Sequence, residues 1–307
     1  MKIIGPDYLS FGVEDLDLCC KYLSDYGLKK ADSAPSGAIF EALDGTALRV
    51  YKSSEPGLPA PVAASPNIRE QVYGVADKAT LDAIGAELAR DRDVKLGSDG
   101  VLRAIDDIGY PLGFQVSHRR RIDNPKHINV PGMSSHRPFN LVAAVDDAPV
   151  PISTLSHVVL FAPDVKKAEK FYAERLGFRT VDVFTNLGPF MRPQGTNDHH
   201  TLFMIQAPHI GVQHFTFHVA DLNDMIHAGW RFVRKGYKSF WGPGRHILGS
   251  NNFWYFNSPF GGLMEYDSDM DLHDDSWVPR HIPANADTSQ TFLLQYTDKW
   301  SPGDQKH

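Results

Sequence analysis

The stretch YLSFGVEDLDLCCKYLSDYGL (residues 8–28) has a counterpart in the second half of the chain, HVVLFAPDVKKAEKFYAERLGF (residues 157–178). Each begins with an apolar run that is typical of a strand. An Asp follows that can cap a helix, and the predicted helix ends at a Gly suited to a left-handed turn. The capping residues are Asp15 and Asp164, and the terminal glycines are Gly27 and Gly177. The chain therefore contains an internal repeat, which constrains the fold before any other signal.

A second pair of related segments lies one in each half. VYGVADKATLDAIGAEL (residues 72–88) resembles FTFHVADLNDMIHAGW (residues 215–230), and both predict a strand, a Val-Ala-Asp step and a helix. The four segments predict four modules of a strand, a helix and further strands, beginning near Tyr8, Arg69, His157 and Gln213. Two modules together would form one curved sheet. We therefore predict an α+β fold of four βαβββ modules in two half-barrel domains.

The composition is that of an ordinary globular protein. The 307 residues, 42% of them hydrophobic, are enough for two domains with cores of their own. The net charge of −6 comes without a basic stripe, which argues against a nucleic-acid partner. We recognise no signal peptide and no apolar run of about 18 residues, so we expect no membrane partner. The adjacent cysteines Cys19 and Cys20 indicate no disulfide framework, and we expect a cytoplasmic protein.

A segment rich in Pro, Asn and Ser separates the two halves. It runs from residue 119 to residue 151 and begins with three arginines, which we interpret as part of a solvated loop. We place the domain boundary within it. The predicted domains are an N-terminal module pair at residues 1–135 and a C-terminal module pair with a tail at residues 136–307.

Three residues of the second half are candidate metal ligands: His157, His214 and Glu265. Alternate residues of a strand share a face, so these side chains converge if their three strands line one barrel. Two imidazoles and one carboxylate are the ligand set of non-haem Fe(II) sites that keep positions open. Metal coordination would also offset the cost of burying the Glu. Any one His taken alone is more often a core or surface residue, so the prediction rests on the joint pattern.

Further motifs make the pattern specific. His199 and His200 precede a predicted strand, and a Gly-x-x-Arg-His motif spans residues 242–246. The run GRHILGSNNFWYFNSPFGGLMEY (residues 244–266) carries, in order, His246, Tyr255 and Glu265. On these motifs the second half closely resembles the type I extradiol ring-cleavage dioxygenases of the vicinal oxygen chelate superfamily. The resemblance covers the whole architecture, but its functional motifs lie only in residues 157–266.

That resemblance implies a fold, an activity and a cofactor. The fold is the glyoxalase-like one of the superfamily. The activity is extradiol, or meta, cleavage of a substituted catechol, which incorporates both atoms of O2 and serves the catabolism of aromatic compounds. The cofactor is a mononuclear Fe(II) on His157, His214 and Glu265, with Mn(II) as an open alternative.

The resemblance also implies catalytic roles. His200 becomes the acid–base partner near bound oxygen, and His246 and Tyr255 lie at the substrate hydroxyls. These residue types suit the roles, because His changes protonation near neutral pH and Tyr can donate a hydrogen bond to an oxyanion. His199, which faces the other way in an extended chain, is the less favoured alternative to His200.

The first half offers no equivalent ligand set. The repeat aligns the three ligands, in chain order, with Tyr8, Glu70 and Gln115, which are not a plausible Fe(II) triad. We therefore expect a metal-free half that packs against and shapes the catalytic half. We also expect a homo-oligomer, to which the first half can contribute subunit contacts.

Weaker candidates surround the motifs. Three arginines could clamp a substrate carboxylate, with an ordinary ion pair as the alternative for each: Arg192, Arg245 and Arg280. Three aromatic residues could line the substrate pocket, with a core position as the alternative: Phe190, Trp241 and Phe253. The segment at residues 277–280 could form a lid. The aromatic residues at 253–260 favour a hydrophobic ring substituent on the substrate.

Two other functions stay open, because this scaffold hosts several chemistries. A metal-dependent isomerase or lyase similar to glyoxalase I would have no use for His200, His246 and Tyr255. A ligand-binding module similar to the bleomycin-resistance proteins would need no metal triad. Extradiol products of catechols are usually yellow in base, so colour separates the three.

Overall fold

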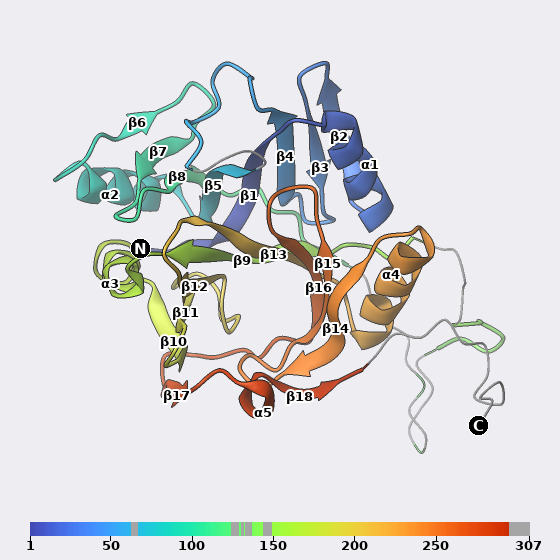
Figure 1. Cartoon of the computed structure of the whole chain (residues 1–307). Helices are drawn as coiled ribbons and strands as arrows, with labels where there is room; N and C mark the ends of the chain where they lie inside the picture. The colour runs from blue at the N-terminus through green and yellow to red at the C-terminus, as the bar shows by residue number, and fades with distance from the viewer. Residues whose placement is uncertain (63–66, 124–128, 130–131, 133–136, 144–148, 295–307) are drawn as a thin grey trace.

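Figure 1 shows the computed structural model of the chain, which describes residues 1–62, 67–123, 129, 132, 137–143 and 149–294. The expected domain boundary between residues 135 and 136 lies outside the described residues. None of the described helices is both long enough and apolar enough to cross a membrane.

The elements follow one another as four βαβββ modules, so the predicted fold class is confirmed. The first two modules are β1 (Ile3–Val13), α1 (Leu16–Tyr26), β2 (Lys29–Ala34), β3 (Gly37–Glu41) and β4 (Ala47–Lys52), then β5 (Asn67–Val75), α2 (Lys78–Leu88), β6 (Lys95–Leu96), β7 (Leu102–Ile105) and β8 (Pro111–Val116). The last two are β9 (Thr154–Ala162), α3 (Val165–Leu176), β10 (Arg179–Phe184), β11 (Gly188–Arg192) and β12 (Leu202–Gln206), then β13 (Gly211–His218), α4 (Leu222–Arg234), β14 (Ser239–His246), β15 (Asn252–Asn257) and β16 (Leu263–Ser268). The tail adds β17 (Arg280–Ile282), α5 (Ala286–Ser289) and β18 (Gln290–Leu293).

The local signals of the repeat are confirmed. The side chains of Asp15 and Asp164 each accept a hydrogen bond from a backbone N–H in the first turn of the helix that follows, at 2.8 and 3.0 Å. Gly27 and Gly177 end these helices with φ angles of 116° and 73°. Glycine adopts this left-handed region without steric cost, so each helix stops where the sequence indicates.

Each half of the chain forms one sheet. The strand order is β2-β3-β4-β1-β5-β8-β7-β6 in the first and β17-β10-β11-β12-β9-β13-β16-β15-β14-β18 in the second. Equivalent strands take equivalent places, and β17 and β18 of the tail are the two outermost strands of the second sheet. In Figure 1 this sheet curves from β10 through β9 and β13 to β14, and the tail crosses between its ends. The strands of the predicted metal ligands, β9, β13 and β16, are neighbours at its centre.

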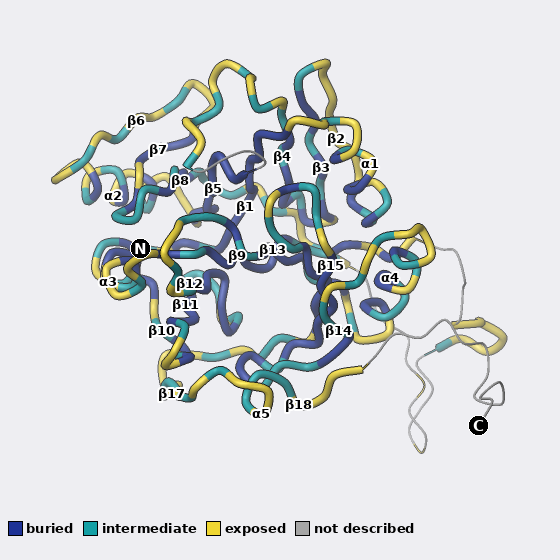
Figure 2. Tube along the Cα trace, viewed as in Figure 1, coloured by how far each residue is buried: buried dark blue, intermediate teal, exposed yellow. Residues whose placement is uncertain are grey.

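The main core joins the two halves. β1 lies against β9 and β5 against β13, while the helices pair across the halves, α1 with α4 and α2 with α3. Phe11 packs on Phe215 with ring centroids 5.1 Å apart. Figure 2 shows the four central strands buried along nearly their whole length. Because one apolar cluster contains residues from both sheets, the N-terminal half supports the C-terminal half directly.

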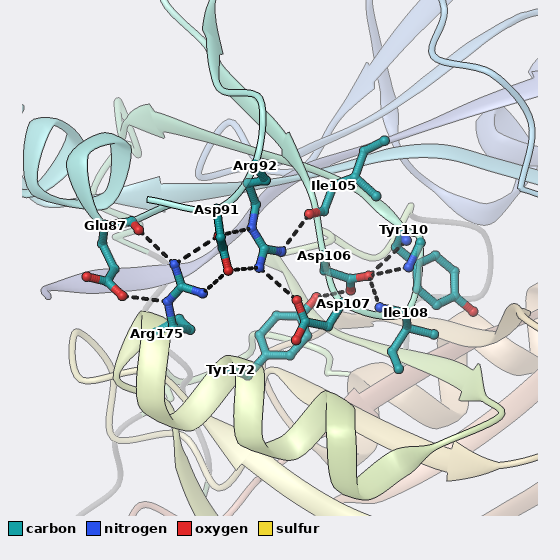
Figure 3. A network of polar contacts seen from close by, with 11 residues as sticks. Glu87, Asp91, Arg92, Ile105, Asp106, Asp107, Ile108, Tyr110, Tyr172 and Arg175 are labelled. Atoms are coloured by element: carbon teal, nitrogen blue, oxygen red, sulfur yellow. Dashed lines mark hydrogen bonds and ion pairs between the residues drawn. The ribbon is translucent and has the colours of Figure 1, made fainter. Parts of the chain in front are cut away.

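Polar groups complete this junction where α2 faces α3 (Figure 3). Arg175 of α3 pairs with Asp91 at 2.8 Å and donates to the backbone carbonyl of Glu87 at 2.7 Å. Tyr172, also on α3, donates to the buried carboxylate of Asp106 at 2.9 Å. The other oxygen of that carboxylate accepts three backbone N–H groups, so the contact holds a turn of the first half to a helix of the second.

The alignment of Gln115 with Glu265 is wrong by two residues. On β13 and β16, Thr216 lies opposite Glu265, and the equivalent pair on β5 and β8 is Val72 and Gly113. Val72 and Thr216 are equivalent because Val72 pairs with Tyr8 on β1 and Thr216 pairs with His157 on β9, and Tyr8 and His157 are equivalent in the repeat. A glycine therefore stands where the second half has its carboxylate. The cross-strand register decides this, and the short sequences of β8 and β16 do not reveal it.

Candidate metal centre and its cavity

His157, His214 and Glu265 meet at one buried point on neighbouring strands. Their nearest ligand atoms lie 3.2 Å apart between the two imidazoles, and 3.3 and 3.4 Å from each imidazole to Oε2 of Glu265. With metal–ligand bonds of about 2.1 Å, neighbouring ligand atoms of an octahedral ion lie roughly 3 Å apart. The triangle therefore has dimensions at which the three residues would hold one ion together.

The electrostatics of the three residues fit a divalent cation. Burial, and after it the neighbouring Asp267, raises the pKa of Glu265 well above its ordinary value. Burial also lowers the pKa of His157 and His214 well below theirs, so both imidazoles are neutral and able to bind a metal. Hydrogen bonding from Thr216 and Tyr255 lowers the pKa of Glu265 but does not outweigh burial, and Oε1 of Glu265 is left without a hydrogen bond of ordinary geometry among the described residues. A cation at this point would supply the missing partner for a carboxylate that burial otherwise disfavours.

Neighbouring polar groups orient the three side chains. His157 shares a hydrogen bond through Nδ1 with the hydroxyl of Ser156 at 2.8 Å, and His214 donates from Nδ1 to the amide oxygen of Gln213. Thr216 donates to Oε2 of Glu265 at 2.5 Å. Partners of this kind fix ring orientation and tautomer in metal sites. Neither Ser156 nor Gln213 is predictable from the sequence, because a strand neighbour of a ligand ordinarily points to the opposite face.

The three predicted catalytic residues lie around the same point. The ring of His200 lies 4.2 Å from that of His157, and Nε2 of His246 lies 3.1 Å from the hydroxyl of Tyr255. Burial lowers the pKa of His246 to about 4 and raises that of Tyr255 well above its usual value. Near neutral pH the site therefore presents a neutral imidazole beside a protonated phenol.

A cavity of about 180 Å³ opens onto these residues, and its wall is otherwise almost entirely apolar. His157, His200, His214, His246 and Tyr255 all line it. The apolar part of the wall consists of Phe184, Leu187, Phe190, Phe203, Ile205, Phe240, Trp241, Leu248, Leu263 and Ala284. Gln213, Asn251 and Ser289 complete it, so no lysine, arginine or acidic residue of the described chain lines this cavity.

The predicted aromatic residues divide into two groups. Phe190 and Trp241 line the cavity, and Phe190 stacks on Phe203 with centroids 3.9 Å apart. Phe253 does not line the cavity; it is fully buried and stacks on His246 at 4.0 Å. Phe253 therefore supports a predicted catalytic ring and lies out of reach of a bound molecule.

The three predicted arginines lie outside the cavity, which does not support the substrate-clamp expectation. Each pairs with a carboxylate, and the pairs are Arg192 with Asp275 at 2.9 Å, Arg245 with Asp269 at 2.8 Å and Arg280 with Asp182 at 2.5 Å. Two of these carboxylates belong to the polar stretch after β16, whose path only the tertiary structure defines. All three arginines therefore take part in ion pairs, which is the alternative that the sequence left open.

The tail contributes to the cavity through a later segment than expected. Trp277 stacks on His273 at 3.9 Å and donates from its indole nitrogen to the backbone of Val181, outside the cavity. Ala284 and Ser289 line the cavity instead. The residues that close the half-barrel therefore follow β17.

In the first half an ion pair stands where the second half has its ligands. Glu70, equivalent to His214, accepts a hydrogen bond from Arg103 at 2.6 Å and lies 3.4 Å from the hydroxyl of Tyr8. Arg49 lies over the ring of Tyr8 at 3.5 Å. The guanidinium of Arg103 therefore pairs with the buried carboxylate of Glu70. In the described part of the chain, His157, His214 and Glu265 form the one group with metal-ligand geometry.

Comparison with known proteins finds a family model that matches part of the second half. Residues 154–266 match the family model of the Glyoxalase/Bleomycin resistance protein/Dioxygenase superfamily. Metapyrocatechase 2 of Cupriavidus necator is 38% identical over 117 residues, which span 38% of this chain and 37% of that relative. Biphenyl-2,3-diol 1,2-dioxygenase of Paraburkholderia xenovorans (strain LB400) is 27% identical over 300 residues, covering 91% of this chain and 92% of the relative.

Solved structures share the fold over nearly the whole chain. The Mn(II)-bound glyoxalase from Novosphingobium aromaticivorans superposes with a TM-score of 0.74 at 20% identity, over 94% of this chain and 90% of its own. BphC, described as a halotolerant catechol dioxygenase, superposes with a TM-score of 0.73 at 17% identity, over 95% and 94%. At these identities the likeness establishes the architecture alone.

Proposed function

Because residues 154–266 belong to the glyoxalase/bleomycin resistance protein/dioxygenase superfamily, we propose that this protein is an extradiol dioxygenase. It opens the ring of a substituted catechol beside the two hydroxyls, incorporates both atoms of O2 and uses a mononuclear Fe(II). One observation carries the proposal: two imidazoles of a metal triad, His157 and His214, and three further side chains able to carry protons line a single, largely apolar cavity. The relatives named metapyrocatechase and biphenyl-2,3-diol 1,2-dioxygenase support it.

The side chains divide the work by their chemistry. His157, His214 and Glu265 would hold the ion, which supplies Lewis acidity and redox activity when bound. His246 and Tyr255, joined at 3.1 Å, would hold the substrate hydroxyls by hydrogen bonds. His200, whose ring lies 4.2 Å from that of His157, would move a proton during ring opening.

The lining of the cavity argues for an apolar ring substituent. Phenylalanine, leucine, isoleucine and tryptophan side chains cannot solvate a carboxylate, and the three arginines that could do so are paired elsewhere. We therefore expect alkyl- or aryl-catechols as substrates. With such substrates, the protein would take part in the catabolism of aromatic compounds.

The test is anaerobic reconstitution with Fe(II), followed by O2 uptake across a panel of catechols. The panel contains an alkyl- or aryl-catechol, plain catechol and a carboxyl-bearing catechol, and the readout is kcat/KM together with a yellow product in base. We expect the apolar catechol to be preferred. A clear preference for the carboxylate would overturn the apolar-substituent part, and a muconate diacid as product would overturn the whole proposal.

Two alternatives are outcomes of the same test. If Mn(II) in place of Fe(II) supports O2 uptake, the metal assignment changes and the reaction stands. An isomerase or lyase, or a ligand-binding module, would consume no O2 with any member of the panel. The homo-oligomer, the cytoplasmic location and the domains at residues 1–135 and 136–307 stay predictions.

A further inference from the structure

His200 is joined to two buried residues that do not line the cavity. Its Nδ1 lies 2.9 Å from Nδ1 of His199, and Nε2 of His199 lies 2.8 Å from a carboxylate oxygen of Asp182. All three side chains are buried. Asp182 is on β10 and the histidines directly precede β12, so the chain of contacts spans the sheet beside the cavity.

Asp182 sets the direction of these hydrogen bonds. Burial raises the pKa of this carboxyl, but hydrogen bonds from His199 and from Arg280 outweigh burial and hold the pKa at about 2. Arg280 contributes its guanidinium at 2.5 Å and its backbone N–H at 2.8 Å. The carboxylate is therefore ionised and can only accept, so Nε2 of His199 must be the donor.

The proton on His199 then decides which nitrogen of His200 is protonated. A neutral imidazole has one donor and one acceptor nitrogen, so a His199 that donates from Nε2 accepts at Nδ1. The donor at that contact is Nδ1 of His200. Because His200 lines the cavity and its Nδ1 is occupied, the nitrogen available to a bound molecule is Nε2, with a free electron pair. Only a doubly protonated His199 would reverse this order.

We propose that His199 and Asp182 are positioning residues that hold His200 as its Nδ1–H tautomer, with Nε2 ready to accept a proton. A carboxylate that fixes the tautomer of a base through hydrogen bonding is an established catalytic device. Arg280 of β17 holds Asp182 in place, so the tail acts on the cavity through this chain. That Nε2 of His200 is used in catalysis rests on the proposed ring cleavage. The assignment of the His200 tautomer is independent of that proposal.

The direct test is nitrogen-15 NMR of the histidine rings in metal-free protein near neutral pH. The signals of His200 are identified by their loss in His200→Gln. We expect the proton of His200 on Nδ1 and that of His199 on Nε2. In Asp182→Asn the obligate acceptor is lost, and the His200 signals should move toward a mixture of tautomers. Asp275→Asn is the matched control, because Asp275 pairs with arginines near the same segment and has no ion pair with a histidine within the described residues.

Steady-state kinetics of the variants distinguishes a positioning role of Asp182 and His199 from general damage to the structure. With bound iron and KM retained, Asp182→Asn and His199→Gln should each lower kcat about 10-fold or more, and Asp275→Asn should not. If Asp182→Asn does not fold, His199→Gln carries the test alone.

Two results would overturn the proposal: a wild-type His200 protonated on Nε2, or variants with unchanged kcat and an unchanged His200 tautomer. A protein with the expected tautomer but no ring cleavage would contradict the proposed function and leave the positioning supported.

Discussion

At the scale of single residues, Glu265 is a buried carboxyl whose charged form burial disfavours. Its carboxyl is fully buried, its pKa is raised by burial and by Asp267, and one oxygen has no hydrogen bond of ordinary geometry among the described residues. Such a group is costly unless something at the site compensates it, and two neutral imidazoles within 3.4 Å mark where a cation would do so.

The first prediction concerns the metal. Replacing His157, His214 or Glu265 with Ala should abolish iron binding while the far-ultraviolet circular dichroism stays that of the wild type. Each ligand is one of only three, and the fold rests on a core shared by both halves. Elemental analysis after reconstitution measures the metal content. Glu70→Gln, at the place of His214 in the first half, should retain one iron per chain; two metals per wild-type chain would contradict the prediction.

The second prediction concerns the acid–base residues. His200→Asn and His246→Asn should keep iron but lose turnover by about 10²-fold or more, the usual scale for a positioned acid or base. Tyr255→Phe should be milder, since it removes one donor next to His246. Single-turnover kinetics at saturating O2 gives the comparison. A His200→Asn variant as fast as wild type would remove His200 from the mechanism.

At the scale of elements, helix α1 of the N-terminal half holds strand β16 of the C-terminal half. The hydroxyl of Tyr26 donates to the backbone carbonyl of Glu265 at 2.6 Å, and the hydroxyl of Tyr266 donates to the backbone carbonyl of Tyr26 at 2.8 Å. The two rings stack with centroids 3.9 Å apart. The backbone of the carboxylate ligand is therefore anchored from the opposite half of the chain.

The third prediction follows from this anchor. Tyr26→Phe leaves a buried carbonyl without its donor, which should lower the free energy of unfolding by about 1–3 kcal/mol and weaken iron binding. Urea denaturation and metal titration measure the two effects. Tyr22 is the matched control on the same helix, because its buried hydroxyl has no hydrogen-bond partner in the described residues. Tyr22→Phe should be neutral or stabilising, and equal losses in both variants would argue against the anchor.

At the scale of the whole molecule, α1 packs on α4 and α2 packs on α3, so both helix pairs join the two halves of the chain. Ion pairs lie at the edges of both contacts. Asp25 of α1 accepts from Lys235 at 2.5 Å and from the hydroxyl of Tyr237 at 2.9 Å, both in the second half. Burial raises the pKa of Asp25, but hydrogen bonds from Lys21, Lys235 and Tyr237 outweigh it and lower the pKa to about 2. An unfolded Asp titrates near roughly 3.9.

The fourth prediction is the resulting pH dependence. Since the folded pKa of Asp25 lies below the unfolded one, its ionisation stabilises the fold above about pH 4, and this stabilisation is lost as pH falls toward 2. Asp25→Asn should therefore unfold at a lower temperature than wild type at neutral pH, with the gap closing in acid. Asp17→Asn, on the exposed part of α1, serves as control. A gap independent of pH would contradict the prediction.

The sequence alone was sufficient to predict features that are determined by residues close together in the chain. The four modules, the caps at Asp15 and Asp164 and the helix-ending glycines depend on a few adjacent side chains, and the structure agrees with each. The candidate ligands could also be proposed from the sequence. Alternation along a strand indicates which face of the sheet a residue takes, and the internal repeat indicates which strands are neighbours.

Contacts between distant segments required the tertiary structure. Gln115 was assigned to the wrong register because β8 and β16 share no side-chain pattern that distinguishes a shift of two residues, which preserves the face. For the arginines the sequence leaves a substrate clamp and an ion pair both open, because nothing near them in sequence reveals the carboxylates of the tail and β10. The link from Asp182 through His199 to His200, and that from Tyr26 to Glu265, join residues far apart in the chain. A hydrogen bond of this kind exists only once packing brings a donor within about 3 Å of its acceptor, and no local pattern encodes that distance.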